Sequence, residues 1–281
     1  NMIFHDPMDL KAAVEEYDAL YPNAGFRHYT DATTGEWHFT YLQGFEADAS
    51  GTGVAVNCRP TKAQMAQLVE IVRKHNGLFV HVHPKSIDYI KSTDPLDYWY
   101  ADYTGLEVYY TIWSDRNSTA TKNNYKLWTD LLKMGKKVWA TAGNDEHAMP
   151  SDKALSTIYS TVQDAQEFVE RAAVGNFTAG AAGVRMVVGD QVMGYETDFT
   201  GKELAFSVGD FHSSVYDPTH TYEAVLIADE EVVGRWEISC EKTFYHTAEA
   251  DASVDYYRVE VYDLTTGEML ALGNPIWNTA K

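Results

Sequence analysis

The sequence predicts an α/β domain, arranged as a parallel sheet or barrel with outer helices, followed by an all-β sandwich. Two observations lead to this prediction. Helical and strand-like patterns alternate over the first two-thirds of the chain, whereas short strand-like runs follow one another after Gly175. Small residues cluster at 174–183, where we expect the domain boundary. The first domain then covers residues 1–176 and the second covers residues 177–281.

The elements of the first domain follow from apolar spacing and from helix-ending residues. Thr61 is a good helix N-cap, and Gly77 and Gly135 are good helix ends. Apolar residues at helical spacing predict helices at 9–20, 61–77, 123–134 and 164–174. Short apolar runs predict strands at 39–45, 78–83, 105–111 and 137–142. This order of strands and helices favours strands that run parallel.

The sequence predicts that the second domain consists of β-strands. Turn residues such as Asp229-Glu230 and Thr266-Gly267 separate its apolar runs, and helical spacing disappears. The predicted strands are 184–188, 204–208, 222–228, 232–238 and 256–262. Short strands at close intervals are typical of a β-sandwich.

Composition excludes several classes of protein. The 281 residues carry 41 acidic and 22 basic side chains, a formal net charge of -19, and 45% of them are hydrophobic. The apolar content is enough for a core, and the acidic balance argues against a nucleic-acid or anionic-membrane surface. No apolar run approaches the roughly 18 residues of a spanning helix. Cys58 and Cys240 leave one long-range disulfide open, but free core thiols are the simpler interpretation.

The first residues carry no sign of a signal peptide. Asn1 to Phe4 lack both a basic start and an apolar stretch. An Asn before Met is unusual for a native start and fits a tag remnant, in which case we expect the chain to begin inside a longer gene product. The composition fits the cytoplasm and an exported protein equally well, if a signal has been removed.

Residues that can bind metal gather at the ends of the predicted strands. His81 and His83 end one strand, Glu46 follows another, and Asp145 and His147 follow a third. The carboxyl ends of parallel strands converge in α/β folds, so we expect these groups to lie close together. A mixture of carboxylates and imidazoles suits Zn, Mn or Fe, and such ions polarise phosphoryl or carbonyl oxygens.

Each of these residues also has a structural interpretation. His81 and His83 share one face of an alternating strand and can be hydrogen-bonded core histidines. Asp145 and His147 can form an ordinary turn, and Glu46 can be a surface carboxylate. Glu107 fits a structural position better than a ligand, because its tyrosine-rich neighbours, Tyr109 among them, suggest the wall of a pocket.

Four segments resemble, in order and in their place at strand ends, successive motifs of the PHP (polymerase and histidinol phosphatase) metal-dependent phosphoesterases. They are Gly44-Phe45-Glu46, Gly77-Leu78-Phe79-Val80-His81-Val82-His83-Pro84, Gly105-Leu106-Glu107-Val108-Tyr109 and Gly143-Asn144-Asp145-Glu146-His147. Residues 256–261 and 273–277 resemble the closing strands of one branch, the CehA/McbA-like metallohydrolases, in which a β-sandwich follows the PHP domain. The resemblance extends from about Phe39 to Trp277.

This resemblance implies a distorted (β/α)7 barrel that binds one to three divalent transition metal ions (Zn, Mn or Fe) and hydrolyses a small phosphate ester. It implies that Glu46, His83, Asp145 and His147 are metal ligands. The family's opening HxH motif has no good match upstream of Glu46, and His5 is the one candidate remnant of the motif that follows it. The predicted barrel is therefore N-terminally incomplete, with fewer ligands than a trinuclear site needs.

Two functions follow from these observations. The first is a metal-dependent phosphoesterase in which Glu46, Asp145 and His147 serve catalysis, with Lys85, Glu107 and Tyr109 as substrate-binding residues. The second is a non-catalytic scaffold that binds a ligand such as a carbohydrate through aromatic side chains of the sandwich. Its candidates, which can equally be core residues, are Tyr195, Trp236, Phe244 and Tyr245. The sandwich can also mediate a homodimer.

Overall fold

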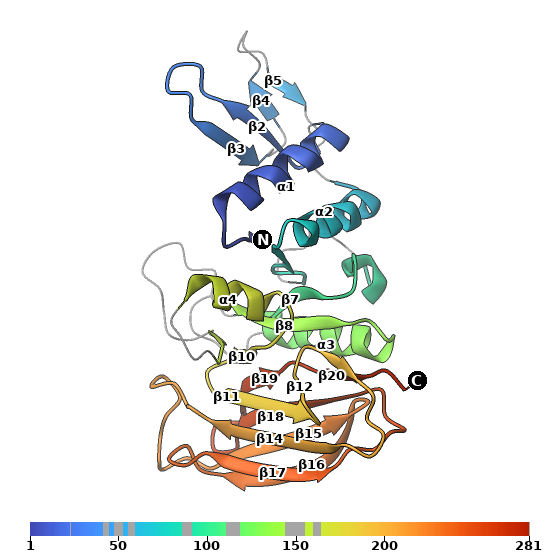
Figure 1. Cartoon of the computed structure of the whole chain (residues 1–281). Helices are drawn as coiled ribbons and strands as arrows, with labels where there is room; N and C mark the ends of the chain where they lie inside the picture. The colour runs from blue at the N-terminus through green and yellow to red at the C-terminus, as the bar shows by residue number, and fades with distance from the viewer. Residues whose placement is uncertain are drawn as a thin grey trace. The chain divides into compact units, whose positions relative to one another are not determined.

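The structure, a computed structural model, describes residues 1–22, 24–41, 45–47, 53–55, 60–85, 92–110, 119–143, 155–159 and 164–280. Its contacts divide the chain into two compact units (Figure 1). The N-terminal unit comprises residues 2–79 and 99–101, and the C-terminal unit comprises Asn1, residues 80–98 and residues 102–281. Residues on both sides of position 176 belong to the C-terminal unit.

The N-terminal unit consists of two helices and short antiparallel strand pairs. Its helices are α1 (Pro7–Leu20) and α2 (Lys62–Lys74). Strands β2 (Phe26–Thr30) and β3 (Trp37–Tyr41) form one pair, and β4 (Phe45–Ala47) and β5 (Gly53–Ala55) form another. Strand β1 (Met2–Ile3) pairs antiparallel with Leu78 and Phe79. The core lies between the helices and β2, with Val14, Tyr17 and Val69 fully buried.

Local signals in the sequence explain where both helices begin. Asp6 caps α1, because its Oδ1 accepts the N–H of Met8 at 2.7 Å, and Pro7 occupies the first helical position. Thr61 caps α2 in a capping box, in which Thr61 N–H donates to Gln64 Oε1 at 2.7 Å. The prediction of an N-cap at Thr61 is confirmed.

The C-terminal unit begins with a parallel three-stranded segment. It is formed by β6 (Leu78–His81), β7 (Thr104–Tyr110) and β8 (Val138–Gly143), with Val80 opposite Gly105 and Leu106 opposite Ala140. The boundary between the units falls inside β6. A short 3-10 helix (Pro95–Tyr98) and α3 (Thr119–Lys133) lie between these strands in the sequence. The buried Trp128 of α3 joins helix to sheet, since its indole N–H donates to the Val138 carbonyl at 3.0 Å.

Two further sheets make up most of the C-terminal unit. One contains β9, β10, β13, β15, β16, β18, β19 and β20, and the other contains β11, β12, β14 and β17. Their bounds, with α4, are β9 (Ser156–Thr157), α4 (Ala165–Ala172), β10 (Thr178–Gly180), β11 (Gly183–Val188), β12 (Gln191–Val192), β13 (Glu196–Thr197), β14 (Glu203–Gly209), β15 (Tyr222–Ala228), β16 (Glu231–Ile238), β17 (Phe244–Glu249), β18 (Tyr256–Asp263), β19 (Glu268–Gly273) and β20 (Ile276–Asn278).

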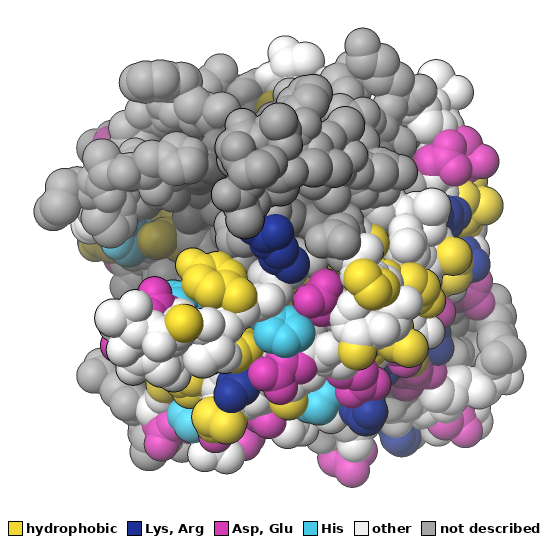
Figure 2. Space-filling model, turned by 90° about the horizontal axis from the view of Figure 1, so that it is seen from above, with side chains coloured by type: hydrophobic (Ala, Val, Ile, Leu, Met, Phe, Trp, Pro, Cys, Tyr) yellow, Lys and Arg dark blue, Asp and Glu magenta, His cyan; other side chains and the backbone are white. Residues whose placement is uncertain are grey.

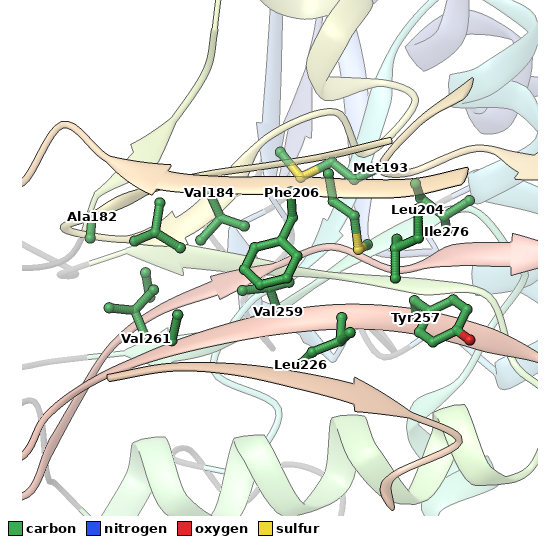
Figure 3. Packing of buried hydrophobic residues seen from close by; sticks show 14 of the residues in the cluster. Ala182, Val184, Met193, Leu204, Phe206, Leu226, Tyr257, Val259, Val261 and Ile276 are labelled. Atoms are coloured by element: carbon green, nitrogen blue, oxygen red, sulfur yellow. The ribbon is translucent and has the colours of Figure 1, made fainter. Parts of the chain in front are cut away.

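The core of these two sheets is continuous. Figure 3 shows Val184 and Phe206 from one sheet facing Val259 and Val261 from the other. The four residues of β18 that alternate with these valines include the buried Arg258 and Glu260, which contact Trp128 and Tyr125 of α3 instead. Strands occur at all five positions that the sequence predicts after residue 183.

The prediction of a (β/α)7 barrel is wrong. The described structure is 38% strand and 24% helix, with several separate sheets and no closed barrel. The strand predicted at 39–45 falls on β3 and the start of β4, which are members of antiparallel pairs. Among the described residues, β6, β7 and β8 pair in parallel, and the only other parallel pair is the short one between β13 and β20. The helices and strands predicted for the first domain are present, but the early strands pair antiparallel and not in the parallel order that a barrel requires.

Polar side chains join the parallel segment to the sheets that follow. Asn274 is fully buried, and its Oδ1 accepts the N–H of Ala140 in β8 at 2.7 Å. Its Nδ2 donates to the carbonyls of Gly175 and Phe177 at 3.2 and 3.1 Å. The segment Gly273-Asn274-Pro275 therefore has a structural role in holding β8 against the last strands.

Among the described helices, none has the length and apolar character needed to cross a membrane. Cys240 is a buried free thiol, and Cys58 lies outside the described residues.

We expect stability to depend on pH through His220. Its imidazole Nδ1 lies 2.7 Å from Asp263 Oδ2, and this hydrogen bond raises the pKa of His220. Burial alone would raise the pKa of Asp263, but hydrogen bonds from His220 and from the N–H groups of Thr265 and Thr266 lower it. The raised histidine pKa stabilises the fold fully below the unfolded value of about 6.5, and this contribution is lost as pH rises through the folded value.

His220→Gln should therefore reduce the free energy of unfolding more at pH 5.5 than at pH 9, as measured by denaturant titration. His212→Gln is the control, because its imidazole contacts the Ser214 hydroxyl and pairs with no carboxylate in the part of the chain that the structure describes. Equal losses for His220→Gln at both pH values would contradict this assignment.

Candidate metal site

The carboxyl ends of β6, β7 and β8 lie along one edge of the parallel segment. His81 is the last residue of β6, His83 follows it by two residues, and Gly143 ends β8. Glu107 lies within β7, opposite Thr141 of β8. The parallel pairing of these strands brings the ends of β6 and β8 to the same edge, on either side of β7.

Glu107 and His83 are in direct contact at this edge. The Glu107 Oε2 atom accepts the backbone N–H of His83 at 2.9 Å, and the same oxygen pairs with Nδ1 of the His83 ring. The carboxylate is buried, with a side-chain exposure of 8%, and the imidazole is 17% exposed. A carboxylate only accepts hydrogen bonds, so this pairing favours a proton on Nδ1, although the contact does not have the geometry of a hydrogen bond. In the neutral form of the ring, Nε2 then carries the lone pair.

His81 is fixed in a similar way by a different acceptor. Its Nδ1 lies 3.1 Å from the carbonyl oxygen of Tyr98, which requires a proton on Nδ1. Burial lowers the pKa of His81 to about 4, and the bond to Tyr98 opposes this shift only in part. His81 is therefore neutral at pH 7, with its lone pair on Nε2.

Lys85 is held by neighbouring groups. Its Nζ donates to the Ser92 carbonyl at 2.7 Å and lies 3.8 Å from the centroid of the Tyr98 ring. Its backbone N–H donates to Oδ1 of Asn124, which is fully buried on α3. The Nδ2 atom of Asn124 has no hydrogen-bond partner among the described residues. The structure thus places a cation and a buried amide beside the segment that carries His83.

Of the remaining predicted site residues, the structure describes Tyr109, His5 and the backbone of Glu46. Tyr109 is fully buried, and its hydroxyl donates to the Met269 carbonyl at 3.2 Å, which gives it a packing position. His5 is exposed in the N-terminal unit, between β1 and α1. Glu46 lies in β4, opposite Val54, and its side chain is not described. Asp145 and His147, which come shortly after β8 in the sequence, lie outside the described residues. The roles predicted for these residues stay predictions.

Among the described residues, no group of three or more His, Cys, Asp or Glu side chains is arranged to hold a metal ion. His81, His83 and Glu107 thus do not form a complete ligand set by themselves. On the face shown in Figure 2, the described Lys and Arg side chains are scattered among Asp, Glu and His. This distribution agrees with the strongly acidic composition.

The aromatic candidates of the sandwich fall into two groups. Tyr245 is 74% exposed on β17, and Tyr195 is 40% exposed. Trp236 and Phe244 are partly buried against the core, and the Trp236 ring lies 4.2 Å from that of His246. Of these four candidates, only Tyr245 therefore presents most of its side chain to solvent.

Sequence reasoning missed three contributors to this edge: Tyr98, Asn124 and Gly143. Tyr98 supplies a carbonyl to His81 and a ring to Lys85, and Asn124 supports the backbone of Lys85. The one available signal was Gly143, a glycine next to predicted ligands. Tyr98 and Asn124 carry no sequence pattern that separates them from other polar core residues.

Comparison of the chain with protein-family models and with curated proteins found no match to either.

Proposed function

We propose that the chain is a metal-dependent hydrolase that acts on a phosphate ester and holds its cation at the carboxyl edge of β6, β7 and β8. The observation that carries this proposal is the His83–Glu107 pair at that edge. Asp145 and His147 follow β8 by only a few residues, and we propose that they complete the ligand set with His83.

The chemistry of the described donors fits a divalent transition metal. Histidines that bind metal usually donate their other ring N–H to a carboxylate or a backbone carbonyl. His81 does so to Tyr98, and Nδ1 of His83 pairs with Glu107. In the neutral tautomer that these contacts favour, each imidazole carries its lone pair on Nε2, which is the form that Zn, Mn or Fe binds.

Charge supports the same assignment. A chain with a formal net charge of -19 repels an anionic substrate unless positive charge is concentrated where the substrate binds. The Lys85 ammonium is the described cation closest in sequence to His83, and it already contacts Ser92 and Tyr98. A divalent cation would supply the missing positive charge, polarise the phosphoryl group and activate water.

The chain's own residues have separable tasks in this proposal. His83, Asp145 and His147 hold the cation, and Glu107 holds the ring of His83. Lys85 contacts Ser92, Tyr98 and Asn124, which hold it two residues after His83. Its predicted contact with substrate would add to this structural role.

The test combines metal analysis with turnover of a chromogenic phosphodiester. We expect the purified chain to retain Zn or Mn and to hydrolyse the diester, and we expect Asp145→Ala and His83→Ala to lower turnover at least about 100-fold. His212→Ala, on the sandwich, is the matched histidine control and should leave turnover unchanged. Wild-type chain that binds neither metal and hydrolyses no phosphate ester would overturn the proposal.

A second candidate function is carbohydrate binding without catalysis. The observation in its favour is the exposed ring of Tyr245 on β17. Aromatic faces stack on sugar rings, so Tyr245→Ala should abolish retention on a polysaccharide matrix if this function holds. Unchanged retention, or none by the wild type, would exclude it.

A further inference from the structure

We infer that Glu107 is a positioning residue, which fixes the His83 imidazole for a divalent cation, and that Gly143 is glycine to leave room for its carboxylate. This inference rests on the proposed function, because it assumes that His83 binds the cation. It assigns a role to two residues that the proposed ligand set does not contain.

The first observation is that Glu107 holds His83 twice. One oxygen, Oε2, accepts the backbone N–H of His83 and pairs with its ring Nδ1. A contact to the ring alone leaves the backbone free to rotate, and a contact to the backbone alone leaves the ring free. Together they fix the main chain and the side chain of one residue relative to one carboxylate.

The second observation is the backbone conformation of His83. Its φ is +49°, in the left-handed region that residues with a side chain seldom adopt. Such a conformation costs free energy and persists only where the surroundings hold it. The bond from His83 N–H to Glu107 is one interaction that stabilises it. The backbone at His83, a predicted ligand, is therefore held in an unfavourable conformation. This conformation sets the direction in which the imidazole leaves the chain.

The third observation is the space beside Gly143. A Cβ atom added to Gly143 would lie 2.2 Å from Oε1 of Glu107, much closer than two such atoms can approach. The pairing of β7 with β8 also shifts register between Glu107 and Tyr109. The end of β8 is thus shaped around the Glu107 carboxylate, which reaches from Gly143 on one side to His83 on the other.

If Glu107 positions His83, its loss should lower the affinity of the chain for a metal ion. Groups that orient a metal-binding histidine typically contribute 10- to 100-fold to affinity, because they fix the tautomer and the direction of the ring. Glu107→Ala should therefore weaken Zn²⁺ binding about 10- to 100-fold. Glu107→Gln keeps an oxygen that can accept both N–H groups and should lose less.

The experiment measures Zn²⁺ affinity by competition with a chromophoric chelator for the full chain and for Glu107→Ala, Glu107→Gln and Gly143→Ala. Gly105→Ala is the matched control. A Cβ there would meet Thr141 and Val80 side chains at 2.9 Å, so it crowds the same sheet without meeting Glu107. We expect weaker binding for Glu107→Ala and Gly143→Ala, partial retention for Glu107→Gln, and near wild-type affinity for Gly105→Ala.

A second readout follows the imidazole itself without metal. Long-range ¹H–¹⁵N spectra of the metal-free chain should show the His83 proton on Nδ1 in the wild type and a mixture of tautomers in Glu107→Ala. Wild-type affinity in both Glu107→Ala and Gly143→Ala, with an unchanged tautomer, would overturn the inference and leave the proposed function standing. If the wild-type chain binds no Zn²⁺, the proposed metal-dependent function is wrong, and the positioning role of Glu107, which rests on it, is wrong as well.

Discussion

Arg258→Met is expected to destabilise the C-terminal unit by about 3–5 kcal/mol, the largest effect we predict for a single substitution. Arg258 is 1% exposed on β18. Its guanidinium Nη2 donates to Glu230 at 2.8 Å, and Nη1 pairs with the buried Glu260. Burial alone would lower the pKa of Arg258, but Glu260, Tyr125 and Glu230 raise it, so the group stays charged.

The cost arises because Met leaves two carboxylates without their cation. Glu260 would retain hydrogen bonds from the hydroxyls of Tyr125 and Tyr262, and Glu230 would retain one from Tyr256. These neutral donors do not balance buried negative charge. The network also reaches α3, because Arg258 lies 4.9 Å from the centroid of the Trp128 ring. The loss should therefore loosen the packing of helix against sheet as well.

Arg235→Met provides the control for this prediction. Arg235 pairs with Glu223 at 2.5 Å on the neighbouring strands β16 and β15, but its side chain is 55% exposed. Exposed pairs contribute about 0–1 kcal/mol, so this variant should be nearly as stable as the wild type. Denaturant unfolding followed by tryptophan fluorescence measures both. A loss below about 1 kcal/mol for Arg258→Met would show that the network is not stabilising.

Asn274→Ala should have the second largest effect, a loss of about 2–4 kcal/mol. The side chain makes three hydrogen bonds in a fully buried position, to Ala140, Gly175 and Phe177. The Gly175 carbonyl keeps a second donor, the N–H of Phe177. The N–H of Ala140 and the carbonyl of Phe177 lose the partner that Asn274 gives them, and burial of such groups is costly.

Asn124→Ala is the matched comparison, because Asn124 is also fully buried but makes one described hydrogen bond, to the N–H of Lys85. Its loss should cost about 1 kcal/mol, less than that of Asn274. The same unfolding measurement ranks the two variants. If Asn124→Ala were the more damaging, the hydrogen bonds of Asn274 would not explain the role of the Gly273-Asn274-Pro275 segment.

Helices and strands were predicted from local signals with useful accuracy. The capping pattern at Thr61 and the apolar spacing after it define α2, and the alternation after residue 183 locates the strands of the two large sheets. These signals are local, because a cap or an alternating run is complete within a few residues. Nothing in them specifies which strand pairs with which.

Strand pairing is where the sequence analysis was wrong. The run Phe39 to Tyr41 is as aromatic and apolar as a buried parallel strand, yet it pairs antiparallel with β2. The predicted barrel required parallel partners for these early strands, and direction depends on contacts between segments far apart in the chain. The expectation failed because the order of strands and helices favours parallel pairing in general but does not identify the partner of a particular strand.

The candidate site was predictable in part for the same reason. His83 stands out by its place at a strand end next to Pro84, and Glu107 by its acidic side chain within an apolar strand. Their contact requires β6 and β7 to be parallel neighbours, which the structure shows. The positions of Tyr98 and Asn124 depend on three-dimensional packing, and no spacing rule reveals them.

The most direct test of the central claim is a crystal structure of the chain grown with Zn²⁺, with diffraction data collected above and below the zinc absorption edge. The account predicts an anomalous peak within about 2.0–2.1 Å of Nε2 of His83, with Glu107 bound to Nδ1 of the same ring. An anomalous map without a peak at His83, at Zn²⁺ concentrations that saturate binding in solution, would contradict the account.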